Sequence, residues 1–375
     1  MLKRILRDAA LQLTLALLLF GLLEGGTRGI LRLRDGHWPE SRAGRFDREI
    51  RDACRLYRPH PFLNTAPSEG ARIELFGKRA SFNRAGYRSP ERELAKKPGT
   101  RRILCAGGST TFDLLAPDDS STWPARLEGL LSQHGPVEVW NGGFPGWTSL
   151  ESLIALELRD IDLEPDLVIL FQAINDLQPG AHQPFDAGYE HGHAEVARRA
   201  LGFELAAPAL WRRSLLVEKL GGLLGRTEED PWRALAWDTG TPRRSALEPA
   251  AARVFERNLR SYLAVARAHG ARVLWVTQMM RLRQDHRQED LAYTARWLPW
   301  LDPESAPREL EALNQVPRSL AAAGLGDLAD AARDLSWEDR DFADPFHFSP
   351  EGSQKLADYL AGKVLALGAL GPGNR

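Results

Sequence analysis

Short apolar runs alternate with amphipathic stretches after residue 100, which predicts a sheet of parallel strands covered by helices. The runs that predict strands are Arg102–Ala106, Val137–Trp140, Asp166–Phe171, Arg272–Thr277 and Leu325–Leu328. The stretches with helical spacing of apolar residues are Thr122–Gln133, Ser149–Leu158, Ala250–His269, Arg308–Ala323 and Ser353–Leu367. This order of elements predicts a doubly wound α/β fold, in which ligands bind beyond the carboxyl ends of the strands.

Two segments interrupt the alternation. Residues 178–249 predict an insertion with a helical patch at Ser214–Leu224, and residues 278–307 predict an irregular loop. The insertion carries His182, His191 and His193 without the cysteine or glutamate spacing of a zinc site, so no metal or other cofactor is expected.

The N-terminal stretch resembles a targeting segment. Basic residues precede the apolar run Ala9–Leu23, which ends at Glu24 without a clear cleavage site. Its fifteen residues are fewer than the approximately 20 that a bilayer span needs. We interpret residues 1–34 as an uncleaved signal-anchor that places the remainder outside the cytoplasm. A cleaved signal peptide and a hydrophobic helix packed on the domain are the alternatives.

Composition places the remainder among globular proteins. The chain has 43% apolar and 26% charged residues and a net charge of −1, which gives no signature of nucleic-acid binding. Its two cysteines, Cys54 and Cys105, have no metal-ligand spacing. Residues 35–100 are polar and rich in arginine and proline, which predicts turns and short strands packed on a main domain at 101–375.

The first predicted strand ends in Gly107-Gly108-Ser109. Two glycines allow a sharp turn that exposes the Ser109 hydroxyl, and a helix that starts there directs free N–H groups at whatever the serine attacks. A serine or threonine that merely caps this helix is the structural alternative.

The last polar stretch contains Asp344-Pro345-Phe346-His347. A turn with this spacing lets the Asp344 carboxylate accept Nδ1–H of His347 and leaves Nε2 free as a base. Ser349-Pro350 predicts the start of the final helix. The alternative is that both side chains only stabilise this turn.

These stretches, together with Asn141-Gly142-Gly143 and Asn175-Asp176, resemble the SGNH/GDSL hydrolase family from about Tyr57 to the end. The resemblance includes the lead-in around Gly86-Tyr87-Arg88 and is typical of membrane-anchored bacterial members. It implies a three-layer, flavodoxin-like domain with five strands in the order 2-1-3-4-5.

The resemblance also implies site roles. Ser109 is the expected nucleophile, His347 the acid and base, and Asp344 the residue that orients it. The expected oxyanion donors are the backbone N–H groups of Ser109 and Gly143 and the Asn175 side chain. We expect Asp176 to support the Asn175 loop by hydrogen bonding. One departure is Ala173, where the family usually has glycine.

The predicted function is a serine esterase that hydrolyses an O-acyl ester on a small molecule, a cell-envelope glycan or a lipid. An O-acetyltransferase of polysaccharide modification would use the same triad, and the sequence does not distinguish water from sugar as acyl acceptor. A catalytically silent glycan-binding protein is the third hypothesis.

Overall fold

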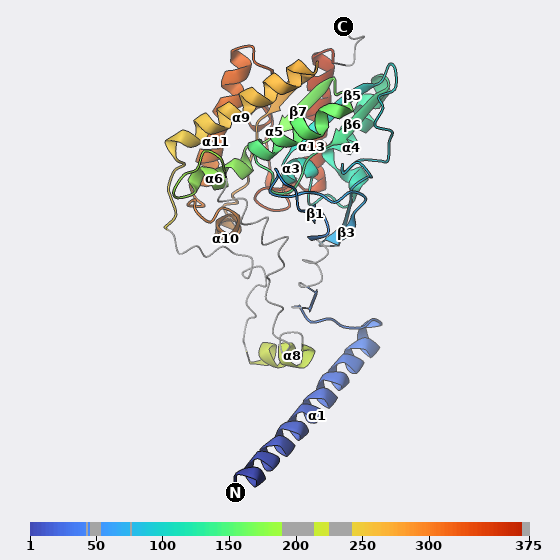
Figure 1. Cartoon of the computed structure of the whole chain (residues 1–375), viewed down its shortest axis with the longest axis vertical. Coiled ribbons are helices and arrows are strands. Elements are labelled where there is room, and N and C mark those ends of the chain that lie inside the picture. Colours follow the sequence, from blue (N-terminus) through green and yellow to red (C-terminus); the bar gives the residue numbers. More distant parts are fainter. Residues whose placement is uncertain (43, 46–53, 76, 190–213, 225–241, 370–375) are drawn as a thin grey trace. The chain divides into compact units, whose positions relative to one another are not determined.

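The computed structural model describes residues 1–42, 44–45, 54–75, 77–189, 214–224 and 242–369. The chain divides into two compact units (Figure 1). The larger unit comprises residues 52–202 and 236–375, and the smaller comprises residues 1–51 and 203–235. His191, His193 and most of the predicted insertion lie outside the described residues.

The larger unit contains a parallel sheet of five strands. The strands are β5 (Arg101–Gly107), β6 (Val137–Asn141), β7 (Leu167–Phe171), β8 (Arg272–Val276) and β9 (Asp327–Ala329). They pair in the order β6-β5-β7-β8-β9, which is 2-1-3-4-5 along the chain and confirms the predicted fold. The order reverses between β5 and β7, the place where such sheets form ligand sites.

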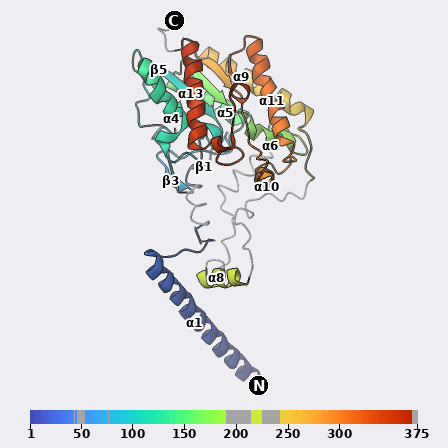
Figure 2. The same cartoon turned by 180° about the vertical axis from the view of Figure 1, so that it is seen from behind.

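Helices cover both faces of the sheet, because successive strand side chains point to opposite faces (Figure 2). Leu104 and Val168 pack in the apolar cluster that includes α5 (Ser149–Leu158), α9 (Pro249–Ala268) and α11 (Ala306–Ala322). Ile103 and Ile169 pack on the other face with α4 (Trp123–Leu131) and α13 (Pro350–Ala366). The three layers fix the strand ends in space.

Buried ion pairs hold the amino end of the sheet. The Arg102 side chain is fully buried; its Nε donates to Glu138 Oε2 over 2.9 Å, and its Nη1 donates to the carbonyl oxygens of Leu94 and Leu163. Asp166 Oδ2 lies 2.7 Å from Lys96 Nζ, and Asp166 Oδ1 accepts from Arg101 Nη1 over 3.1 Å. These contacts join β5, β6 and the lead-in to β7.

The lead-in forms two short antiparallel pairs, as the turn-rich sequence predicts. They are β1 (Tyr57–Arg58) with β2 (Ala66–Pro67), and β3 (Arg72–Leu75) with β4 (Lys78–Ser81). Phe82 packs with Phe112 and Phe144, which follow β5 and β6.

The segment 278–307 is not wholly irregular, contrary to the sequence prediction. It contains α10 (Arg287–Trp297), whose buried residues are Asp290, Leu291 and Thr294. Two of these three residues are polar, so the helix has little apolar periodicity to detect. Further short helices among the described residues are α3 (Ser109–Phe112), α6 (Leu177–Ala181), α12 (Ala331–Asp334) and the 3-10 turns Asp119–Ser121, Ser132–His134, Asp160–Leu163, Ile174–Asp176 and Asp339–Asp341.

The smaller unit contains α1 (Leu2–Asp35) and α8 (Leu215–Leu223). Within the described residues, α1 is the one helix that is long and apolar enough to cross a membrane, and its apolar stretch is not buried. The helix ends at Gly36, whose φ of 77° closes its last turn.

Candidate active site

Ser109 is the first residue of α3, directly after the turn that ends β5. Gly107 has a φ of 147°, and a Cβ there would lie 2.2 Å from the carbonyl oxygen of Phe171. At Gly108 a Cβ would lie 2.3 Å from Asn175 Nδ2. Both glycines are therefore required by close approach. Gly108 caps α3, so Ser109 does not serve as the cap.

The structure brings Ser109, His347 and Asp344 together. His347 Nε2 lies 2.8 Å from Ser109 Oγ, and Nδ1 lies 2.8 Å from Asp344 Oδ2. Asp344 Oδ1 accepts the backbone N–H groups of Phe346 and His347, each over 2.8 Å. The predicted cap at Ser349 is also present and starts α13 directly after this turn. A hydroxyl, an imidazole and a carboxylate thus form one hydrogen-bonded chain.

The charges within this hydrogen-bonded triad make the His347 imidazole a stronger base. Burial alone would lower the pKa of His347, but the charge and hydrogen bond of Asp344 and the charge of Asp113 raise it above its usual value. Burial alone would raise the pKa of Asp344, yet the charge and hydrogen bond of His347, the Phe346 N–H and Tyr293 hold it below its usual value. Asp344 is therefore ionised wherever His347 can act as a base.

Tyr293 of α10 is a contact that the sequence did not reveal. Its hydroxyl donates to Asp344 Oδ2 over 2.7 Å, and its ring packs against Phe346. The Asp344 oxygen that accepts from His347 is thus shared with a second donor. The sequence does not predict α10, so it gives no signal for this tyrosine.

Asn175 lies beyond the end of β7, in the turn Ile174–Asp176. Its Nδ2 donates to the carbonyl oxygen of Trp147 over 2.8 Å and lies beside Gly108. An amide nitrogen carries two hydrogens, so this bond leaves one for a ligand next to Ser109.

Gly143 lies in a different environment from the one expected for an oxyanion donor. Its N–H donates to Asn141 Oδ1 over 3.0 Å, and a Cβ at Gly143 would lie 2.3 Å from Phe112 N. From the same loop it is the Trp147 carbonyl oxygen that lies beside Gly108, 3.2 Å from where a Cβ there would be. Trp147 follows Gly146, whose φ is 89°, and its N–H donates to the carbonyl oxygen of Phe144.

Asp176 is buried and bonded to neutral donors. It accepts from the N–H and hydroxyl of Ser149 and, over 2.9 Å, from Gln172 Nε2. Burial raises its pKa to about 7 against the opposite effect of these hydrogen bonds. These contacts tie the Asn175 turn to the start of α5.

Gln278, which follows β8, connects three parts of the site from a buried position. Its Nε2 donates to Thr110 Oγ1 over 2.8 Å and to the carbonyl oxygen of Phe171 over 3.3 Å. Its Oε1 accepts the N–H of Ile174. The nucleophile helix, the end of β7 and the Asn175 turn are thus held by one side chain.

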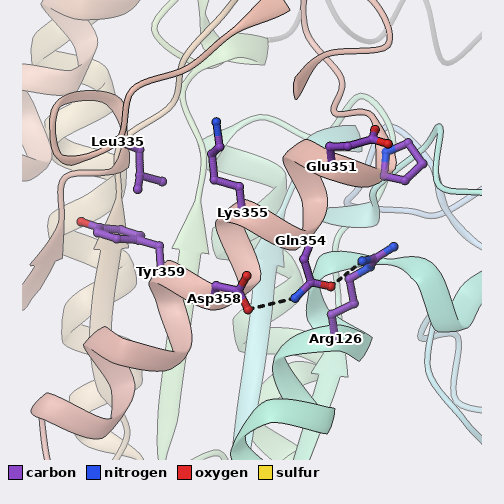
Figure 3. Close-up of a pocket in the computed structure, with 8 residues that line it drawn as sticks. Arg126, Leu335, Glu351, Gln354, Lys355, Asp358 and Tyr359 are labelled. Carbon is purple, nitrogen blue, oxygen red and sulfur yellow. Dashed lines mark hydrogen bonds between the residues drawn. The ribbon is translucent and has the colours of Figure 1, made fainter. Parts of the chain in front are cut away.

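Ala173 packs into the main apolar core at 1% exposure, with an extended backbone that any residue adopts. Its methyl group therefore belongs to the core. Figure 3 shows a surface hollow of about 800 Å³ on α4 and α13, whose lining includes Arg126, Gln354 and Tyr359 but none of the triad residues.

A family model describes the same segment: residues 105–355 match the GDSL-like lipase/acylhydrolase family, which is more than half of the chain. The chain belongs to this family. The family supports an ester-hydrolysing enzyme in preference to a catalytically silent glycan-binding protein. Among curated proteins, none matches the sequence.

Solved structures similar to this GDSL acylhydrolase are distant. A GDSL-like lipase from Bacteroides thetaiotaomicron has 13% identity and a TM-score of 0.41, covering 74% of this chain and 93% of its own. A lipase/acylhydrolase from Enterococcus faecalis has 17% identity and a TM-score of 0.42, covering 71% and 96%. At these values the likenesses carry no information on substrate.

Proposed function

We propose that this GDSL acylhydrolase is a membrane-anchored serine esterase that hydrolyses O-acyl esters of a cell-envelope glycan or lipid. The observation that carries the proposal is the continuous chain of 2.8 Å contacts from Ser109 Oγ through His347 to Asp344. The anchor is α1, and an enzyme held by it would meet esters at the membrane surface.

In the first step His347 Nε2 removes the hydroxyl proton of Ser109 while Oγ bonds to the ester carbonyl carbon. Asp344 accepts Nδ1–H and stabilises the imidazolium. The carbonyl oxygen becomes an oxyanion. When the tetrahedral intermediate collapses, the C–O bond to the alcohol breaks and His347 gives the proton to the leaving oxygen. Water then repeats the sequence on the acyl-enzyme and releases the acid.

The oxyanion needs donors that are already in place. We assign the N–H of Ser109, which begins α3, and Nδ2 of Asn175. For the third donor we propose the N–H of Gly146 in place of that of Gly143. Gly143 already donates to Asn141 and lies against α3, whereas Gly146 directly precedes Trp147, whose carbonyl oxygen lies beside Gly108.

Hydrolysis of p-nitrophenyl acetate by the full chain in detergent tests the nucleophile. We expect Ser109→Ala to lower kcat by about 10⁶-fold, whereas Ser132→Ala, an exposed serine at the end of α4, leaves it unchanged. A fluorophosphonate should form one adduct, at Ser109, with loss of fluoride. Equal activity of the two variants would contradict the proposal.

Two further measurements test its finer parts. Acetylated oligosaccharides offered with a second sugar should release free acid. Transfer of the acetyl group to the sugar hydroxyl would identify an O-acetyltransferase instead.

The mass of the protein isolated from membranes should be that of a chain that retains α1. Loss of about 25 residues would contradict the anchor.

A further inference from the structure

Glu24 ends the apolar run of α1 and receives the start of another helix. Its Oε2 accepts the Ser214 hydroxyl over 2.7 Å and the N–H of Leu216 over 2.9 Å. Its Oε1 accepts the N–H of Leu215 over 3.0 Å and Nε of Arg28 over 2.7 Å. A helix start carries free N–H groups and partial positive charge, so a carboxylate is a matched partner. Helix α8 is therefore attached to α1 at one defined point.

Helix α8 has two unlike sides. Leu215 is buried against its neighbours, whereas Leu220, Leu223 and Leu224 are 49%, 83% and 76% exposed. Spacings of three and four residues place these exposed leucines on one side. Glu218 lies on the polar side of α8, and its Oε2 accepts the N–H of Arg42 over 2.9 Å. Leaving such leucines in water costs about 1.5–3 kcal/mol each.

The exposed apolar surface of α1 indicates that a lipid bilayer covers these leucines. Its run Ala9–Leu23 is apolar, exposed and part of a helix long enough to cross a membrane. At 1.5 Å per residue the run spans only about 22 Å, whereas the hydrocarbon of a bilayer is about 30 Å thick. Because the apolar run is shorter than the hydrocarbon is thick, Glu24, the charged residue that ends the run, would lie at the edge of the hydrocarbon. The start of α8, which Glu24 binds, would lie at the same depth.

We propose that α8 is a membrane-surface helix that buries Leu220, Leu223 and Leu224 among lipid acyl chains and is fixed to α1 by Glu24. The partner is the lipid bilayer itself. The inference rests on the membrane anchoring proposed above. An amphipathic helix at this depth is stable because its apolar side enters the acyl boundary while its polar side stays hydrated. Since α8 lies in the segment between β7 and β8, the catalytic domain has a second covalent connection to the membrane.

Depth measurements on the full chain in phosphatidylcholine vesicles test this. Single cysteines at Leu223, Gly222 and Leu15 would be labelled with an environment-sensitive fluorophore in a Cys54→Ser background; Cys105 is fully buried. We expect doxyl-labelled lipids to quench the label at Leu223 and iodide to quench it at Gly222, an exposed position of the same helix that is one or two residues from each of the three leucines and therefore points away from them. Quenching of Leu223 by iodide alone would overturn the proposal.

Leu15 separates the two inferences. Its label should be quenched by lipid, since it lies within the apolar run. Iodide quenching at Leu15 would contradict the anchor itself, whereas lipid quenching at Leu15 without quenching at Leu223 would reject only the role of α8. Ester hydrolysis by each labelled protein reports that the catalytic domain is folded.

Glu24→Ala tests the attachment, with Asp8→Ala as a matched loss of an acid from α1. We expect Glu24→Ala to remove most of the lipid quenching at Leu223. Asp8→Ala should leave it unchanged, because Asp8 forms an ion pair with its neighbour Arg7 and none with α8 in the described residues. Unchanged quenching in Glu24→Ala would show that Glu24 does not fix α8.

Discussion

The two ends of the central sheet both hold carboxylates, but they hold them with different partners. At the amino end, Asp166 binds the cations Lys96 and Arg101, and its pKa is held below its usual value against the effect of burial. At the carboxyl end, Asp176 binds the neutral groups of Ser149 and Gln172, and burial raises its pKa to about 7.

The difference reflects two roles: the carboxylates at the amino end stabilise the sheet, and those at the carboxyl end surround the reacting groups. A carboxylate paired with cations stays ionised over a wide pH range and fixes the strands that carry it. Asp344 lies between these cases: its partners are N–H groups, a tyrosine and an imidazole whose own charge changes with protonation. Proton transfer at the carboxyl end therefore depends on a carboxylate, Asp344, whose partner His347 can gain and lose a proton. The partners of Asp166 at the amino end stay charged.

Among tests that compare the two ends, the largest effect is expected when the same substitution, Asp to Asn, is made at each end. Asp344→Asn should lower kcat by about 10⁴-fold, because an amide no longer holds the His347 tautomer that is a base at Nε2. Asp166→Asn should leave kcat unchanged and lower the free energy of unfolding by about 1–3 kcal/mol. Esterase kinetics and urea unfolding of both variants check this, and similar kcat losses would break the comparison.

Arg102→Met gives the next effect, on stability alone. The change removes the buried cation that pairs with Glu138 and that donates to the carbonyl groups of Leu94 and Leu163, so we expect a loss of about 3–5 kcal/mol in the free energy of unfolding. Because Arg102 is at the amino end, kcat of the folded variant should equal that of the parent. A large fall in kcat at temperatures where the variant is folded would show that the two ends are coupled.

Asn175→Ala sharpens the comparison at the carboxyl end. Loss of one oxyanion donor should reduce kcat by about 10²–10³-fold, with a smaller change in KM. The variant also loses the bond to Trp147, so circular dichroism and unfolding should accompany the kinetics. A change in KM alone would assign Asn175 to substrate binding instead.

The smallest effect concerns pH. His347 must be neutral to act as a base, and its pKa is raised, so kcat/KM should fall as pH drops through a value above about 6.5. Tyr293→Phe removes a donor that stabilises the Asp344 carboxylate. The carboxylate then attracts the imidazolium more strongly, and the acidic limb should move upward by less than about one unit. An unmoved limb with lower stability would mean that Tyr293 is only structural.

The strands and their order could be predicted because each is a short apolar run between turn residues, as in Asp166–Phe171. The triad residues could be found because each lies next to a marked turn. Helix α10 could not, since its inner side carries Asp290, which pairs with Arg281 and Arg283. Periodicity does not detect a helix that buries ion pairs, and Tyr293 was missed with it.

The sequence also could not predict which glycine of the loop after β6 lies next to Ser109. The loop after β6 contains Gly142, Gly143 and Gly146, and the sequence alone does not say which of them borders the serine. That depends on the Asn141 side chain, which turns back onto the Gly143 N–H. The boundaries proposed at residues 34 and 100, and the insertion at 178–249, stay predictions.

Gln278 has a consequence for how substrate range can change. One amide joins the serine helix to the Asn175 turn, so the groups that would stabilise developing charge need little reorganisation during the reaction. Changes of shape that admit a different acyl group or alcohol must then come from elements outside this connection, such as α10. The charge-stabilising part can stay constant while the surrounding surface diverges, which is a route to new substrates on an unchanged reaction.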